Sequence, residues 1–281
     1  MEGKTQRADR GRLSAPRPRA VTTRNSSPSK AEEPPTPQHP DAKPSIPVQV
    51  KPAQQEAKAA KVEPPMAADV EEPETPAASS AWSEFSRGDP KSPKIAVTFD
   101  AGWENRPGAK ILDVLAKHHV HSTFFLTGRW AEKNPDLTKR IFAEGHEIGN
   151  HTWSHKRLTK LSAAQIAEDA DKTEQLIVKL TGKSTKPLLR VPYGTRDKRV
   201  VSILAKLGYR SIYWDEDCWD SVKPNVTSAE IEARVIAKTR NGSVILMHIG
   251  SEATANALDS IIEKLETAGF QPVTVGELLN S

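Results

Sequence analysis

Cysteine, aromatic residues and long apolar runs are all scarce in this chain of 281 residues. The single cysteine, Cys218, excludes a disulfide bond within the chain and gives no information about the redox compartment. No apolar run reaches the length of about 20 residues that a membrane-spanning helix needs. Met1 is not followed by the charged start, apolar stretch and cleavage site of a secretory signal, so export is not expected from the sequence as written.

The composition of the chain is strongly uneven. Residues 1–81 contain no aromatic side chain, and 15 of the 22 prolines lie in residues 1–90. Such a segment buries too little apolar surface to offset its chain entropy, so we expect a disordered low-complexity tail over residues 1–88. Residues 89–281 are expected to form one folded domain.

The net charge of +4 owes much to the basic start of the chain, where residues 1–30 hold eight Lys or Arg and two acidic residues. Charge runs in proline-rich tails mostly keep the chain extended and soluble, so this one is weak evidence for a nucleic-acid partner. A nucleic-acid protein would show strongly salt-dependent binding that disappears when residues 1–90 are removed. We expect no nucleic-acid partner. The sequence does not define the oligomeric state, and a monomer is our working expectation.

Short apolar runs alternate with amphipathic segments from Lys94 onward. The runs predict strands at residues 94–100, 121–127, 146–150, 188–192, 209–215, 243–249 and 272–275. The segments between them predict helices, the longest from an N-cap at Ser162 to a stop at Gly182. Strands separated by helices pair in parallel, which indicates an α/β barrel or a doubly wound sheet. About seven such units without a glycine-rich dinucleotide motif favour the barrel.

Polar, titratable residues lie at or just after the carboxyl ends of five of the predicted strands. They are Asp100, His151 with His155, Arg190, Asp217 with Asp220, and His248. In barrels and open parallel sheets the chemistry lies at the carboxyl ends of the strands. We therefore expect these residues to share one rim, and their coincidence argues for a site.

The strongest local signal is the pair His151 and His155. On one helical turn, two imidazoles at this spacing lie on the same face and can bind one metal ion. A bare pair is more often a helix start with one packed and one solvated histidine, but carboxylates at other strand ends favour the metal site. Taken alone, Asp100 could simply cap the next turn, and His248 could be a core residue whose hydrogen bonds are all made within the protein.

Five motifs occur in a fixed order along the chain. They are TFDAG at 98–102, HTWSH at 151–155, RVPYG at 190–194, WDEDCWD at 214–220 and LMH at 246–248. The ordered set resembles the polysaccharide deacetylases of carbohydrate esterase family 4, the NodB homology domain. The resemblance implies a distorted (β/α) barrel of seven or eight strands and a metal-dependent hydrolase that removes acetyl groups from a polysaccharide.

The resemblance also implies a role for each matching residue. Asp100 would be the general base and His248 the general acid. Arg190 would orient Asp100. The ligands of a divalent metal ion would be His151 and His155, with zinc expected and cobalt or manganese as alternatives. A bound ion lowers the pKa of water from about 15.7 towards about 7.

Further residues are implied around the acid and the substrate. Asp220, with Asp217 as the alternative, would hydrogen-bond the catalytic histidine and keep it protonated. Tyr193 would offer its backbone N–H to the tetrahedral oxyanion. Leu246 would line the pocket for the acetyl methyl group, and Trp214 belongs to the same substrate-binding set.

The chain departs from the family pattern at two positions. The first motif of the family usually reads TFDDG, and its second aspartate, a metal ligand, is Ala101 here. Three alternatives follow: Glu104 substitutes for it, Asp100 itself coordinates the ion, or the metal is weakly bound or absent. We rank an active enzyme with a modified metal site first. At Ser221 the family often has tryptophan, so one wall of the substrate pocket is weakened.

The preferred substrate is an amino sugar of peptidoglycan or a related cell-surface glycan. One alternative is a glycan-binding module that kept the cleft of a deacetylase without its turnover, with Ala101 as the disabling change. Another is a polysaccharide O-acetyl esterase. The family works mostly at cell walls and on extracellular polymers, so we expect that location although no secretory signal is visible.

Overall fold

The computed structural model of the protein describes residues 84–102 and 106–281. The expected tail over residues 1–88 therefore lies outside the described residues except for its last five. These five are part of the fold, because Phe85 forms a parallel bridge with Ile212 and Arg87 an antiparallel bridge with Ser243. Backbone pairing thus begins at Phe85, whereas the folded domain was expected to begin at residue 89.

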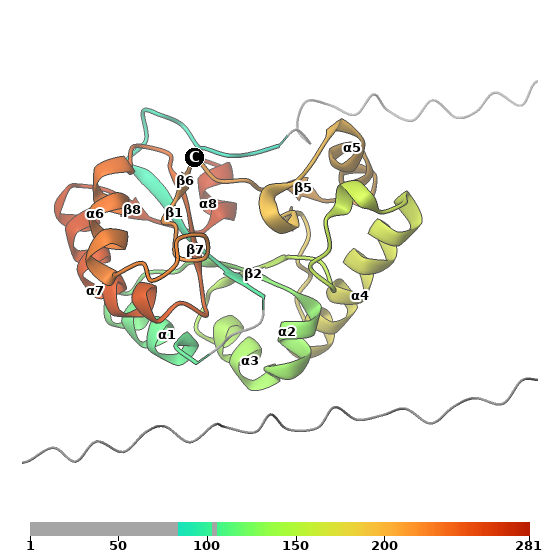
Figure 1. Ribbon diagram of the computed structural model, residues 1–281, viewed down its shortest axis with the longest axis horizontal. Coiled ribbons are helices and arrows are strands. Elements are labelled where there is room, and N and C mark those ends of the chain that lie inside the picture. Colours follow the sequence, from blue (N-terminus) through green and yellow to red (C-terminus); the bar gives the residue numbers. More distant parts are fainter. Residues whose placement is uncertain (1–83, 103–105) are drawn as a thin grey trace, which may run out of the picture. The chain divides into compact units, whose positions relative to one another are not determined.

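An eight-stranded parallel sheet forms the centre of the domain (Figure 1). Its strands are β1 (Lys94–Ala101), β2 (Thr123–Leu126), β3 (Glu147–Asn150), β4 (Leu188–Leu189), β5 (Arg210–Ser211), β6 (Glu216–Asp217), β7 (Val244–His248) and β8 (Gln271–Pro272). The order is β5-β4-β3-β2-β1-β7-β6, and β8 pairs with β1. The predicted α/β class is confirmed, and the barrel takes the form of a curled half-barrel. In the described part of the chain no pairing joins β5 to β6.

The strand predicted over residues 209–215 is shorter in the structure, where only β5 lies in that range and β6 begins after it. β5 pairs with β4, and β6 pairs with β7 at the other end of the sheet order. Residues 212–215 cross between them and bond to other segments instead, with Tyr213 N donating to Phe85 O at 2.7 Å and Asp215 N to Val244 O at 3.2 Å. Residues 85–88 therefore pair with the crossing on one side and with residues 242–243, just before β7, on the other.

Helices surround the strands (Figure 1). They are α1 (Gly108–Lys117), α2 (Gly128–Lys133), α3 (Pro135–Ala143), α4 (Ala163–Thr181), α5 (Lys198–Lys206), α6 (Ser228–Lys238), α7 (Glu252–Thr267) and α8 (Val275–Leu279). The ends predicted for α4 are confirmed: Ser162 and Gln165 form a capping box, and Gly182 closes the helix with φ 73°. No helix among residues 84–102 and 106–281 has the length and apolar composition needed to cross a membrane.

Strand β1 separates the core from the site. Ile95, Val97 and Phe99 belong to the main hydrophobic cluster under the helices, and each buried side chain of this kind contributes about 1.5–3 kcal/mol. The alternate residues Thr98 and Asp100 are also buried, and both contact the same arginine within the half-barrel. Because side chains alternate along a strand, the apolar face anchors β1 and the polar face carries the chemistry.

Candidate active site

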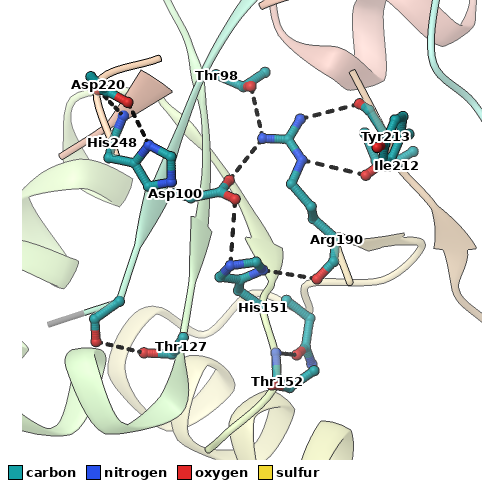
Figure 2. A network of polar contacts seen from close by, with 12 residues as sticks. Thr98, Asp100, Thr127, His151, Thr152, Arg190, Ile212, Tyr213, Asp220 and His248 are labelled. Atoms are coloured by element: carbon teal, nitrogen blue, oxygen red, sulfur yellow. Dashed lines mark hydrogen bonds and ion pairs between the residues drawn. The ribbon is translucent and has the colours of Figure 1, made fainter. Parts of the chain in front are cut away.

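The ends of β1 and β7 bring two titratable side chains together. Asp100 and His248 are register partners in the parallel pair of these strands. Asp100 is only 5% exposed, whereas 28% of the His248 side chain reaches solvent. Figure 2 shows both at one rim of the sheet, together with His151 and Arg190. The expectation that these strand ends share one rim is met for these four residues.

Arg190 lies directly after β4 and is fully buried. Its Nη1 donates to Asp100 Oδ1 at 2.7 Å and to Thr98 Oγ1 at 2.9 Å. Its Nε and Nη2 donate to the carbonyls of Ile212 and Tyr213 at 3.3 and 3.4 Å (Figure 2). A guanidinium held at all three nitrogens cannot turn, so it fixes the orientation of the carboxylate.

The environment of Asp100 keeps it ionised. Burial raises the pKa of its carboxyl group, but the charges of Arg190, His151 and His248 and the hydrogen bond from Arg190 outweigh burial, and the net pKa is lowered. Since Arg190 occupies Oδ1, the second oxygen, Oδ2, is the one left for chemistry. It lies 3.4 Å from Nε2 of His151.

His151 and His155 lie close together, with ring centroids 4.9 Å apart. The predicted helical turn is wrong, because residues 151–155 form a loop in which Thr152 and His155 have φ of 64° and 55°. Several contacts hold this conformation. Asn150 Oδ1 accepts a bond from Thr152 N at 2.8 Å, Gly128 N at the start of α2 donates to Thr152 O at 2.9 Å, and Asp169 accepts bonds from the next two residues of the loop. The loop brings the imidazoles together without a helix.

Both imidazoles are in the form that binds metals. Nδ1 of His151 lies 2.8 Å from the carbonyl of Arg190, so it carries the proton and Nε2 presents a lone pair. Burial lowers the pKa of His151, and it lowers that of His155 to about 4, so both rings are neutral at neutral pH. The lone pair on Nε2 of His151 faces Asp100 Oδ2. Both atoms are acceptors, so a cation between them would satisfy both.

These residues fit a divalent ion in part. Neutral imidazoles and an ionised carboxylate are zinc-type donors. Among residues 84–102 and 106–281, however, no group of three or more His, Cys, Asp or Glu side chains is arranged to hold a metal. Ala101 offers no donor, and Glu104, the substitute considered from sequence, lies outside the described residues. The two histidines alone are thus one ligand short of the three that a catalytic zinc site usually has.

Asp220 rather than Asp217 is the partner of His248. Its Oδ1 lies 2.7 Å from His248 Nδ1, and its Oδ2 accepts bonds from His248 N at 2.8 Å and from Thr254 Oγ1 at 2.6 Å. Asp217 Oδ1 instead accepts from the backbone N–H of Trp219 at 2.7 Å. Because Nδ1 donates to a carboxylate, the other ring nitrogen of His248 is left for a ligand.

The pKa of His248 is raised. Burial lowers it, but the hydrogen bond and charge of Asp220, followed by the charges of Asp100 and Asp217, more than compensate. The site therefore holds an ionised carboxylate with a lowered pKa beside an imidazole with a raised one. Such a pair can take a proton at one group and give one at the other.

A family model described as polysaccharide deacetylase matches residues 87–212. The peptidoglycan-N-acetylmuramic acid deacetylase PdaA of Bacillus subtilis is 35% identical over 199 residues, which are 70% of this chain and 76% of that protein. The chain belongs to the polysaccharide deacetylase family. Membership of this family identifies the protein as a deacetylase, which is a kind of hydrolase.

Solved structures of family members have the same fold. The structure of Bacillus subtilis PdaA, a family 4 carbohydrate esterase, matches with a TM-score of 0.67 and 35% identity over 70% of this chain and 84% of that one. A pseudoenzyme of the same family from Bacillus anthracis matches with a TM-score of 0.66 and 32% identity over 70% and 68%. A mutant of that pseudoenzyme has restored enzymatic activity and matches with a TM-score of 0.66 and 33% identity over 70% and 71%.

The predicted substrate-binding residues of this deacetylase occupy different environments. Tyr193 has φ 59° and is 52% exposed, and its ring lies 4.5 Å from that of His155. Leu246 is buried two residues before His248 on the same face of β7. Trp214 is half-buried and stacks on Tyr213 with centroids 4.1 Å apart.

Two threonines of the site escaped the sequence analysis. Thr98 links Arg190 to the barrel wall, because its Oγ1 accepts from Arg190 and donates to Ile245 O at 2.7 Å. Thr254, at the start of α7, holds the second oxygen of Asp220. Thr98 lies two residues before Asp100, so strand alternation could have revealed it. Thr254 gives no comparable signal.

Proposed function

We propose that this protein removes N-acetyl groups from amino sugars of peptidoglycan with the help of a divalent metal ion. The observation that carries the proposal is the pairing of Asp100 with His248 across β1 and β7, each backed by its own buried partner. The relatives named for peptidoglycan support the substrate. They include the N-acetylglucosamine deacetylase of Bacillus cereus, 35% identical over 67% of this chain and 69% of that protein. A peptidoglycan substrate would place the protein at the cell wall.

In the proposed reaction Asp100 acts as the general base. A water molecule attacks the acetyl carbonyl carbon, and Oδ2 of Asp100 takes its proton while Arg190 holds Oδ1 in place. His151 and His155 would hold the ion, zinc in first place with cobalt or manganese as alternatives. When bound, such an ion polarises the carbonyl and lowers the pKa of water from about 15.7 towards about 7.

His248 acts as the general acid. The C–N bond of the amide breaks, Nε2 of the imidazolium delivers its proton to the departing nitrogen, and the products are acetate and a free amine. Asp220 holds Nδ1 and stabilises the charged ring. The backbone N–H of Tyr193 is assigned to the tetrahedral oxyanion, and Leu246 to the wall around the acetyl methyl group.

The pH profile of acetate release should depend on Asp220. His248 must be protonated, so activity is lost as the pH rises through its raised pKa. Asp220→Asn removes the charge that opposes burial, and we expect the alkaline limb of kcat/KM to move to lower pH. Asp217→Asn should move it less, because Asp217 contributes least among the three carboxylates. Equal shifts in the two variants would contradict the assignment of Asp220.

A second candidate function is glycan binding without turnover. Ala101 favours it, because this position lacks the family's metal ligand, and a family pseudoenzyme is among the similar structures. The two functions separate in a panel of peptidoglycan, chitooligosaccharides and O-acetylated xylan, each assayed for acetate release and for binding with added zinc, cobalt or manganese. We expect acetate from peptidoglycan. Binding without acetate would favour the second candidate, and release from xylan alone would favour an O-acetyl esterase.

A further inference from the structure

Two loops beside the site carry an excess of positive charge. Residues 156–160 follow His155, and residues 193–199 run from Tyr193 into the first turn of α5. We call the two loops together the basic surface, because they hold six Lys or Arg and a single acidic residue, Asp197. The basic residues are Lys156, Arg157, Lys160, Arg196, Lys198 and Arg199. The proposed mechanism uses none of these six, so their position needs a separate explanation.

Hydrogen bonds join the two loops. Arg199, from the second loop, donates from Nη1 to Leu161 O at 3.0 Å and from Nη2 to Thr159 O at 3.2 Å. Arg157, from the first loop, donates from Nη1 to Thr195 Oγ1 at 2.6 Å. Because each loop holds a side chain of the other, their cations lie on one continuous region of the surface.

Five of the six cations are exposed and have no acidic partner. Arg196 is half-buried and pairs with Glu84. None of the other five forms an ion pair with a carboxylate in the described part of the chain. The carboxylate of Asp197 instead caps the start of α5. On the helices the pattern differs, as Lys117 shows by its ion pair with Asp259 at 2.6 Å. The basic surface therefore keeps a positive charge that attracts anions.

The basic surface reaches the proposed catalytic site through Tyr193. The guanidinium of Arg157 lies 4.5 Å from the centroid of the Tyr193 ring. That ring lies 4.5 Å from the ring of His155, a proposed metal ligand. Nη1 of Arg157 is held by Thr195, and its Nε and Nη2 form no hydrogen bond with any residue that the structure describes. Two adjacent donors of this kind match the two oxygens of a carboxylate. An acidic group on a sugar next to the reacting one is therefore within reach of Arg157.

We propose that the basic surface binds the carboxylates of an anionic glycan strand whose acetyl group lies at the catalytic site. This inference rests on the proposed deacetylation of peptidoglycan and adds the charge of the preferred strand. Each N-acetylmuramic acid of peptidoglycan bears a lactyl carboxylate or a peptide that ends in carboxylates, whereas a chain of N-acetylglucosamine alone is neutral. Arg157 binds the carboxylate nearest the reacting sugar, and the lysines attract those further along the strand. The basic surface thus selects an acidic glycan over a neutral one.

Binding of two matched tetrasaccharides, measured by calorimetry, tests this role. One alternates N-acetylglucosamine with N-acetylmuramic acid and has free lactyl carboxylates, and the other is the same molecule with those groups converted to methyl amides. The protein carries His248→Ala, so that the acetyl groups stay intact. Adding Lys156→Gln with Arg157→Gln should weaken binding of the acidic form about tenfold in low salt, because two ion contacts are lost. Binding of the methyl amide should not change.

Two controls accompany this comparison. Lys139→Gln with Lys179→Gln removes the same amount of charge from exposed positions of α3 and α4, and we expect both affinities to stay unchanged. High salt should remove most of the preference of the parent for the acidic form, because it screens exposed charges.

The outcomes separate this inference from the proposed reaction. Equal affinity of the parent for the two forms, or an equal loss for both on changing Lys156 and Arg157, overturns the role of the basic surface while the deacetylase proposal stands. A peptide of the same charge that binds as tightly as the acidic tetrasaccharide overturns the selection of a glycan. Charge-dependent glycan binding by a protein that, with His248 restored, releases no acetate supports the basic surface and overturns the proposed turnover. A parent that binds neither form overturns the basic surface, and acetate release from whole peptidoglycan then decides the reaction separately.

Discussion

Acetate release should fall by more than about 100-fold when Asp100 is replaced by Asn, because an amide cannot accept the proton of the attacking water. The substitution keeps the shape of the side chain, and Arg190, itself held by Thr98, remains in place beside it. It also leaves the buried charge of Arg190 without its partner, which typically costs about 3–5 kcal/mol of stability. We therefore expect a lower melting temperature together with the loss of activity, and kcat/KM must be measured well below that temperature.

A second variant separates chemistry from stability. His248→Ala leaves the ion pair of Asp100 and Arg190 intact, so we expect a comparable loss of acetate release with a smaller change in melting temperature. Asp113→Asn is a matched acid-to-amide control, since Asp113 pairs with Arg140 at the surface of α1. That control should retain full activity. Substantial acetate release by either Asp100→Asn or His248→Ala would remove the proposed base or acid.

Ala101→Asp is expected to complete the metal site. Ala101 is fully buried and belongs to the main hydrophobic cluster, where a carboxylate is costly unless a cation is close. The side chain restores the ligand that the family usually has after Asp100. Metal affinity should rise by more than about tenfold, since even the loss of an outer partner of a ligand costs about 10–100-fold. Acetate release at limiting zinc should rise with it.

Melting temperature gives a readout of the same substitution that does not depend on activity. Without metal, Ala101→Asp should melt below the parent protein, because the new carboxylate is buried. At a zinc concentration 100 times the dissociation constant of the variant, binding stabilises the variant by about 2.7 kcal/mol. The parent binds zinc more weakly, so it should gain less at the same concentration. Ala101→Asn is the neutral control and should gain no more from zinc than the parent does. An unchanged zinc affinity in Ala101→Asp would mean that another group, such as Asp100, already fills the place.

The sequence located the strand ends better than the loops between them. Asp100 and His248 could be placed because each ends an apolar run, and parallel pairing then fixes which ends meet. The conformation of residues 151–155 could not be predicted from spacing, since it depends on contacts with Asn150 and Gly128. The crossing at residues 212–215 depends on pairing with Phe85, a residue expected to lie in the tail.

Partners far apart in sequence were also beyond prediction. Thr254 reaches Asp220 across 34 positions, and Thr98 bonds to Ile245 across 147. No sequence pattern predicts such a bond for a threonine in a helix or strand. The resemblance to the family put Asp220 before Asp217, and the geometry of the loop after β6 assigns Asp220 to His248.

Acetate released from purified peptidoglycan by the zinc-supplemented protein is the most direct test of the proposed turnover. We expect sustained release over many turnovers, with free amino groups appearing in equal amount and with no release by His248→Ala under the same conditions. Peptidoglycan that binds the protein yet yields no acetate with zinc, cobalt or manganese would contradict the account.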